Sequence, residues 1–224
     1  MKHSLKVYIR SLYDSQMSDV INNPKSIISI TEPDEMLQCT AVQLDSCVLQ
    51  LLKTPCLKAQ MTAILSDPFK IKFIKKPSEK LQVLAVSKDA KSLLLIENPS
   101  EKAKCAAIEQ NPDTIKYIDK PCEELQLLAV QKDTKAIEYI SEPTERVQMY
   151  AVLLNPELIF KIKNPCDSAI YHSVESITGT EIFPSLENIS KLRQIFEDKI
   201  SRNTYNMDNE ALLKVEVKRT FQEE

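Results

Sequence analysis

Apolar and polar residues recur along this chain with a fixed period, and that period predicts helices. Seven prolines lie 22 residues apart, and the fifth, ninth and tenth positions of each unit carry small or aliphatic residues at nearly every repeat. Spacings of four and five residues place these side chains on one face, so the first half of each unit is predicted to be a helix of about ten residues. The seven prolines are Pro33, Pro55, Pro77, Pro99, Pro121, Pro143 and Pro165.

The second half of each unit carries two aliphatic residues three positions apart, which predicts a second helix of about seven residues. Its predicted N-caps are acidic or amide residues, followed in three units by proline at the first helical position. For the first helix, we interpret Asn98-Pro99-Ser100-Glu101 as a cap, an N1 proline and an N3 glutamate. The predicted caps of the second helix are Asp45, Asp67, Asp89, Asn111, Asp133 and Asn155, with Pro68, Pro112 and Pro156 after three of them.

Both ends of the array depart from the repeat. Residues 11–32 keep the pattern without the leading proline, and residues 165–186 lose the second pair of aliphatic residues. We therefore expect an all-α protein whose residues 1–186 form a right-handed α-solenoid of eight HEAT-like helix-turn-helix repeats with atypical ends. Residues 187–224 are expected to form a C-terminal amphipathic helix and tail that cap the array. Within that tail, residues 211–221 fit either a helix or a short strand.

The amino-acid composition limits the kinds of functional site that the chain can form. Gly179 is the only glycine, so glycine-rich phosphate loops are excluded, and the formal net charge is only −3. No Cys-x-x-Cys pair occurs, and only His3 and His172 could supply imidazole. We expect no catalytic, metal or cofactor site and reduced cysteines. No signal peptide or membrane span is predicted, which indicates a soluble cytoplasmic protein, in the host cytoplasm if the protein is viral.

A glutamine ladder occupies the sixth position of the first helix. It could read the backbone of a partner or RNA bases, but we favour amides that satisfy the turn to the next repeat, since buried helix ends need partners. Lys104 interrupts the series. The glutamines are Gln38, Gln60, Gln82, Gln126 and Gln148.

The strongest local charge lies between Lys53 and Lys91, where nine lysines face three carboxylates for a balance of +6. This patch could hold a phosphate backbone or an acidic protein surface. It could equally be a solvated face with lysines near helix C-termini. Residues 121–150 have a balance of −3, so charge is polarised along the chain. The predicted partner-binding residues are Lys53, Lys70, Lys72, Lys75, Lys76, Lys91, Lys116 and Lys120.

Aromatic and cysteine side chains each have a functional and a packing interpretation. Phe73, Tyr117 and Tyr139 recur at one repeat position beside a core aliphatic residue, and we favour packing over stacking on bases. Three cysteines occupy the second position of their units, where serine or threonine stands elsewhere, and we favour small-residue substitution over nucleophilic catalysis. These cysteines are Cys56, Cys122 and Cys166.

Units such as PSEKLQVLAVSKDAKSLLLIEN and PCEELQLLAVQKDTKAIEYISE resemble short helical repeats, with a P-S-E-x-x-Q-x-x-A-V core, of phage and bacterial proteins of unknown function. The resemblance covers residues 11–186 and carries no catalytic residues with it. It implies a non-catalytic, phage-encoded inhibitor that docks on a host defence complex such as a CRISPR effector. The alternative is an RNA- or DNA-contacting module that uses the Lys53–Lys91 patch, within a ribonucleoprotein. An enzyme is the least favoured alternative.

Overall fold

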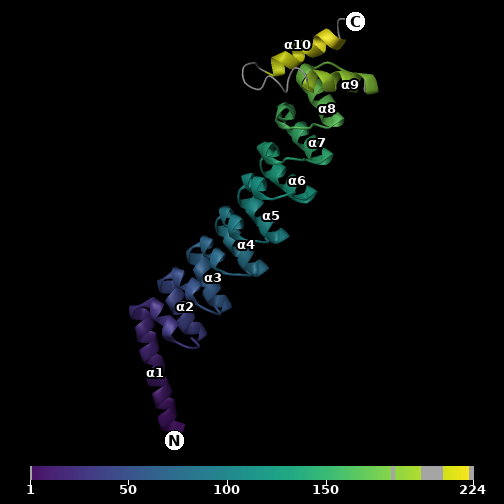
Figure 1. The fold of residues 1–224 in the computed structure, drawn as a ribbon. Coiled ribbons are helices and arrows are strands. Elements are labelled where there is room, and N and C mark those ends of the chain that lie inside the picture. The colour runs from purple at the N-terminus through teal and green to yellow at the C-terminus, as the bar shows by residue number, and fades with distance from the viewer. Residues whose placement is uncertain (1, 183–184, 198–208, 222–224) are drawn as a thin grey trace. The chain divides into compact units, whose positions relative to one another are not determined.

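A computed structural model describes residues 2–182, 185–197 and 209–221, and these residues are all-helical, without a strand. The chain divides into two compact units, an N-terminal unit of Met1–Gln110 and a C-terminal unit of Asn111–Glu224. In each unit, α-helices alternate with short 3-10 helices, as the 22-residue period predicts. Within the N-terminal unit, α2 to α5 lie side by side in chain order (Figure 1).

The α-helices of the repeats are about the predicted length, but the second helix of each unit is a 3-10 helix of six residues rather than an α-helix. A 3-10 helix has three residues per turn, so aliphatic residues three apart fall on its buried face. The α-helices are α1 (Lys2–Asn22), α2 (Glu35–Leu44), α3 (Leu57–Ser66), α4 (Glu79–Lys88), α5 (Glu101–Gln110), α6 (Glu123–Lys132), α7 (Glu145–Leu154), α8 (Asp167–Thr178), α9 (Leu186–Ile195) and α10 (Asn209–Phe221). The 3-10 helices are η1 (Pro24–Ser29), η2 (Ser46–Leu51), η3 (Pro68–Phe73), η4 (Ala90–Leu95), η5 (Pro112–Tyr117), η6 (Thr134–Tyr139) and η7 (Pro156–Lys161).

One residue both ends each α-helix and starts the following 3-10 helix, and this explains the compact repeat. The backbone N–H of Asp45 donates to Ala41 O at 2.9 Å and closes α2, while its side chain accepts from Cys47 N at 2.9 Å and caps η2. Its extended backbone, with φ −143° and ψ 102°, turns the chain between the two helices. All six predicted caps of the second helix are confirmed in this position, and no separate linker is needed.

The predicted start of the first helix is wrong by two residues. The helix α5 begins at Glu101, and the backbone N–H of Ala103 donates to the Ser100 hydroxyl at 3.3 Å. Ser100 is therefore the N-cap, and Glu101 is the first helical residue instead of the third. The preceding proline restricts the chain to an extended entry, and the residue after it caps the helix.

The core of each unit runs along the buried faces of successive helices. The alanine at the ninth position, such as Ala41 or Ala85, is fully buried in each complete repeat and allows neighbouring helices to approach closely. Aliphatic residues from both halves of the unit, such as Val86 and Leu93, complete the packing. Stability therefore comes from stacking of neighbour on neighbour, because helices this short are marginal alone.

The ends of the array differ from the repeats. In the N-terminal unit, α1 has 21 residues and extends well before the predicted start of the first repeat. In the C-terminal unit, α8 ends at Gly179 in the left-handed conformation with φ 67°, which glycine adopts without a steric cost. The helices α9 and α10 pack on α8 and on each other (Figure 1).

The segment that fitted either a helix or a strand is a helix, α10. Its buried residues Leu213 and Val217 are four positions apart, which is helical spacing, and α10 packs against α8 and α9. The alternation at Val215–Lys218 that suggested a strand leaves Val215 exposed. No helix among the described residues is long and apolar enough to cross a membrane.

Candidate partner-binding grooves

The glutamine ladder binds the turns of the protein itself, as predicted. The Gln82 side-chain amide donates to Pro77 O at 3.0 Å, and its oxygen accepts from Ser100 N at 2.8 Å. Each such glutamine thus joins the turn before its own helix to the cap of the next helix. Gln38, Gln126 and Gln148 make the same two bonds, and Gln60 makes the first of them. These amides are committed to the fold and are poor candidates for reading a partner.

Where the α-helices begin, three positive side chains are neutralised within the protein, whereas Lys80 at the same position of α4 forms no ion pair with a described residue. A glutamate at the first position of one helix pairs with a lysine or arginine 23 residues later, at the second position of the next helix. We call this row of first-turn residues the helix-start edge. The pairs are Glu35–Lys58 at 3.5 Å, Glu79–Lys102 at 2.7 Å and Glu123–Arg146 at 3.2 Å.

The lysines in the last turn of η3 and in the loop after it have no such carboxylate partners. Lys72, Lys75 and Lys76 are exposed, and no ion pair to them is formed among the described residues. They line a groove of about 620 Å³ between η3 and η4, here called the second groove, together with Leu95 and Glu97. This part of the protein can accept negative charge, because its own carboxylates do not neutralise it.

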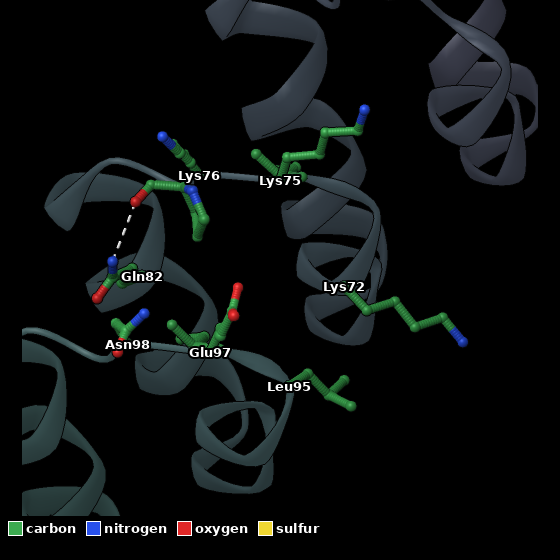
Figure 2. Close-up of a pocket in the computed structure, with 10 residues that line it drawn as sticks. Lys72, Lys75, Lys76, Gln82, Leu95, Glu97 and Asn98 are labelled. Carbon is green, nitrogen blue, oxygen red and sulfur yellow. Dashed lines mark hydrogen bonds between the residues drawn. The ribbon is translucent and has the colours of Figure 1, made fainter.

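The three lysines share the groove but do not converge on one point. Figure 2 shows their ammonium groups pointing apart, while the Glu97 carboxylate points toward the turn that carries Lys75 and Lys76. A single buried anion would need donors aimed at one centre. The observed arrangement instead spreads positive charge along a rim, which suits an acidic surface or segment with several separated charges.

The remaining lysines predicted in this region lie elsewhere. The Lys70 ammonium is 3.2 Å from Asp67 and 3.3 Å from Cys47 Sγ, its side chain is only 14% exposed, and these two hydrogen bonds raise its pKa. Lys53 lines a separate groove of about 640 Å³ between η1 and η2, the first groove. Lys91 is exposed on η4 and lines neither groove.

The predicted Lys116 and Lys120 come together in the C-terminal unit. They line a groove of about 330 Å³ between η5 and η6, the third groove, with Tyr117 and Tyr139. The Lys116 ammonium lies 5.1 Å from the centroid of each tyrosine ring, within range of a cation–π contact. Lys120 has a positive φ of 45°, unlike any other non-glycine residue described.

The packing predicted for the three recurring aromatic residues holds only in part. Phe73 is half-buried, with Lys70 and Lys72 at 5.8 and 5.0 Å from its ring centroid. Tyr117 and Tyr139 are instead 47% and 42% exposed, so the prediction of core packing is wrong for these two. Their position in the last turn of a 3-10 helix points them outward, where they contact a lysine rather than the core. The signal that sequence reasoning missed is a Lys-aromatic pair in the same register at Lys72-Phe73 and Lys116-Tyr117.

The cysteines have structural positions. Cys56, Cys122 and Cys166 are N-caps of α-helices, where Ser78 and Thr144 stand in other units. None of the six cysteines, which all lie within the described ranges, forms a disulfide. Burial raises the pKa of Cys166, which keeps this thiol neutral at physiological pH.

For Cys39, burial and then the neighbouring Cys56 thiol raise the pKa in the same direction. Over the described ranges, no three His, Cys, Asp or Glu side chains are grouped to hold a metal ion. What the second and third grooves offer chemically is positive charge beside apolar surface, with two tyrosine rings in the third groove.

Comparison with known proteins adds no relative: no protein-family model, no curated protein and no solved structure matches this chain.

Proposed function

We propose that this chain is a non-catalytic binding protein whose second groove docks an acidic segment of a partner protein. The observation that supports it most is the contrast between two sets of positive side chains. Lys58 and Lys102 on the helix-start edge are paired with glutamates, whereas Lys72, Lys75 and Lys76 around the second groove are left without carboxylate partners. Electrostatic complementarity at such a rim favours encounter with a negatively charged partner.

A protein partner is favoured over nucleic acid by the aromatic contacts. Binding of single strands generally uses exposed rings on which bases stack. No aromatic side chain is among the residues that line the second groove, and Phe73 beside it is half-buried with two ammonium groups near its ring. Leu95 and the aliphatic stems of the lysines supply apolar contact that an amphipathic acidic peptide can use.

The resemblance of the repeats extends this proposal. It makes a host defence complex, such as a CRISPR effector, the proposed source of the partner, with the chain acting as a phage-encoded inhibitor. A right-handed, HEAT-like solenoid is part of the same proposal, supported within each unit by helices that pack in chain order.

The experiment is a titration of the protein with a short, fluorescently labelled Asp/Glu-rich peptide and, separately, with a labelled single-stranded RNA. The test variant is Lys72→Glu/Lys76→Glu. The matched control is Lys80→Glu/Lys88→Glu, which makes the same charge change on exposed positions of α4. Each ion pair lost between the groove and the peptide is worth up to about 1 kcal/mol, and each new repulsion between glutamate and peptide adds to that loss. We therefore expect the test variant to bind the peptide at this groove about tenfold more weakly.

The control should bind the peptide as the wild type does. Equal loss in both variants would show that only net charge matters, and the assignment of this groove would be wrong. Tighter binding of the RNA than of the peptide, lost in the test variant, would replace the protein partner by nucleic acid. A pull-down from bacterial lysate with and without nuclease would then identify the partner.

A further inference from the structure

A longer period lies beneath the 22-residue repeat. The proline at the start of the 3-10 helix occurs only in alternate units, 44 residues apart. The fifth position of the 22-residue unit alternates in step, with leucine in Leu37, Leu81 and Leu125 and a smaller residue in the units between. The true unit of the array is therefore a pair of repeats. The prolines that show it are Pro24, Pro68, Pro112 and Pro156.

The three grooves described above lie at this longer spacing. The first lies between η1 and η2, the second between η3 and η4, and the third between η5 and η6. Residues 44 apart therefore occupy equivalent places, so their side chains can be compared directly.

The second and third grooves share their binding chemistry. Lys72 and Lys76 correspond to Lys116 and Lys120, and no ion pair to any of these four lysines is formed within the described part of the chain. In both units the first of these lysines lies over the aromatic ring of the next residue, at 5.0 Å from Phe73 and at 5.1 Å from Tyr117. Tyr117 lines the third groove, whereas Phe73 lies beside the second groove without lining it. The wall residue Leu95 is replaced by Tyr139, which adds a second ring around Lys116.

The first groove has lost this chemistry. Ile28 and Glu32 stand where the second groove has Lys72 and Lys76, and Ser29 stands where Phe73 follows Lys72. Lys53 is the one lysine among its lining residues, and Glu32 faces the same groove. The first groove thus serves as an internal control with the same backbone and no positive rim.

We propose that the third groove is a second docking site for an acidic protein segment, of the same kind as the second groove. This inference rests on the proposed function for the recognition chemistry, but the site is in the other unit and is tested separately. The Lys116 ammonium, which lies near two rings, is the anchor for a carboxylate, and Lys120, in the loop after η5, supplies the second positive charge of the groove. Ion pairing on an already positioned ammonium loses less side-chain entropy than pairing on a free lysine.

The positive charge of the third groove favours an acidic occupant. This charge is smaller than that of the second groove. Asp119 replaces Lys75, and Ser141 replaces Glu97, so the lining carries two lysines against one carboxylate. We therefore expect the third groove to bind the same acidic peptide less tightly than the second groove does, with a larger share of the contact from the tyrosine rings.

The test is NMR of the full chain with 13C-dimethylated lysines, which keep their charge, titrated with the short acidic peptide at low ionic strength. Ring currents of Tyr117 and Tyr139 should move the Lys116 methyl signal upfield in the free protein. Saturable movement of that signal on peptide addition supports the proposal. Lys116→Glu/Lys120→Glu should lower the number of bound peptides from two to one while the Lys72 signal still responds.

The other outcomes separate the two proposals. A Lys116 signal that does not respond, with a normal Lys72 response, overturns the second site and leaves the proposed function intact. A response of Lys116 without one of Lys72 overturns the assignment of the second groove instead. Equal responses from all lysines, including Lys53 in the first groove, would mean diffuse charge attraction and would overturn both. Salt screens attraction between exposed charges, so the salt dependence of each lysine signal is used to compare the responses of the three grooves.

Discussion

Replacing Gln126 by leucine should destabilise the C-terminal unit through three backbone groups that lose their partners. Gln126 is 5% exposed, and its amide donates to Pro121 O at 2.9 Å and to Glu142 O at 3.3 Å. Its oxygen accepts from Thr144 N at 3.0 Å. Leucine fills a similar volume but offers none of these bonds. The change therefore isolates the hydrogen bonds from the packing.

The expected loss follows from the cost of unsatisfied polar groups. A buried donor or acceptor without a partner costs about 1–3 kcal/mol, and partial exposure of this turn places each of the three groups at or below the lower limit. Added apolar burial by leucine returns about 0.5 kcal/mol. We expect the free energy of unfolding to fall by about 2 kcal/mol.

The assay is urea unfolding followed by far-UV circular dichroism, with Gln131→Leu as the matched control. Gln131 lies on the same helix, α6, and is exposed, so its replacement should change stability by less than about 0.5 kcal/mol. Because repeat arrays can unfold in parts, hydrogen exchange at the Thr144 amide localises the effect, and its protection should fall. Equal stability of the two variants would refute the structural role of the glutamine ladder.

Three further predictions concern the core, a turn and the cysteines. Leu81→Ala should lower the free energy of unfolding by about 2–5 kcal/mol, measured by urea unfolding, because Leu81 is almost fully buried; a loss below about 1 kcal/mol would contradict this. Lys120→Gly should be less destabilising than the equivalent Lys76→Gly by about 1 kcal/mol, since only Lys120 has a positive φ, and equal unfolding curves would exclude strain there. Iodoacetamide should modify exposed Cys47 before Cys166 at neutral pH, by mass spectrometry, because burial raises the pKa of Cys166; raising the pH should narrow the gap, and equal rates at neutral pH would be inconsistent with it.

The Glu79–Lys102 pair allows a test of pH dependence. The hydrogen bond to Glu79 raises the pKa of Lys102, so folding favours the charged form of this lysine. A folded pKa above the unfolded value gives a contribution that is fully present below the unfolded lysine pKa and is lost as pH rises through the folded pKa. Lys102→Met should therefore differ slightly in melting temperature from the wild type at neutral pH and not at all at strongly alkaline pH. The difference at neutral pH is small because the Lys102 and Glu79 side chains are both exposed. A difference that grows with pH would contradict this account.

Local signals in the sequence were enough to predict the repeated helices. The prolines set the period, and Asp45 and its equivalents mark the junction between the two helices of each unit because capping depends on residues two or three apart. The same reasoning did not distinguish an α-helix from a 3-10 helix in the second half of the unit. Two aliphatic residues three apart satisfy both, and only the six-residue length between two extended residues decides it.

Features that depend on packing were harder to predict. The local pattern of the α10 segment fits both a helix and a strand, and the burial of Leu213 and Val217, in a helix that packs against α8 and α9, decides between them. Among the lysines, the sequence identified the positive segment but not which members are neutralised. Pairs 23 residues apart, such as Glu79 with Lys102, become neighbours only when repeats stack. The Lys-aromatic pairs and the 44-residue period were visible in the sequence, and they would have indicated the third groove.

A charge-swap titration at the second groove tests the central claim most directly. Wild-type protein and Lys72→Glu/Lys76→Glu are each titrated with an Asp/Glu-rich peptide and with the same peptide carrying lysine at every acidic position. The account predicts that the variant loses the acidic peptide at this groove and gains the basic one, and that Lys80→Glu/Lys88→Glu does neither. If the variant binds the acidic peptide as the wild type does, the unpaired lysines of the second groove are not a docking site.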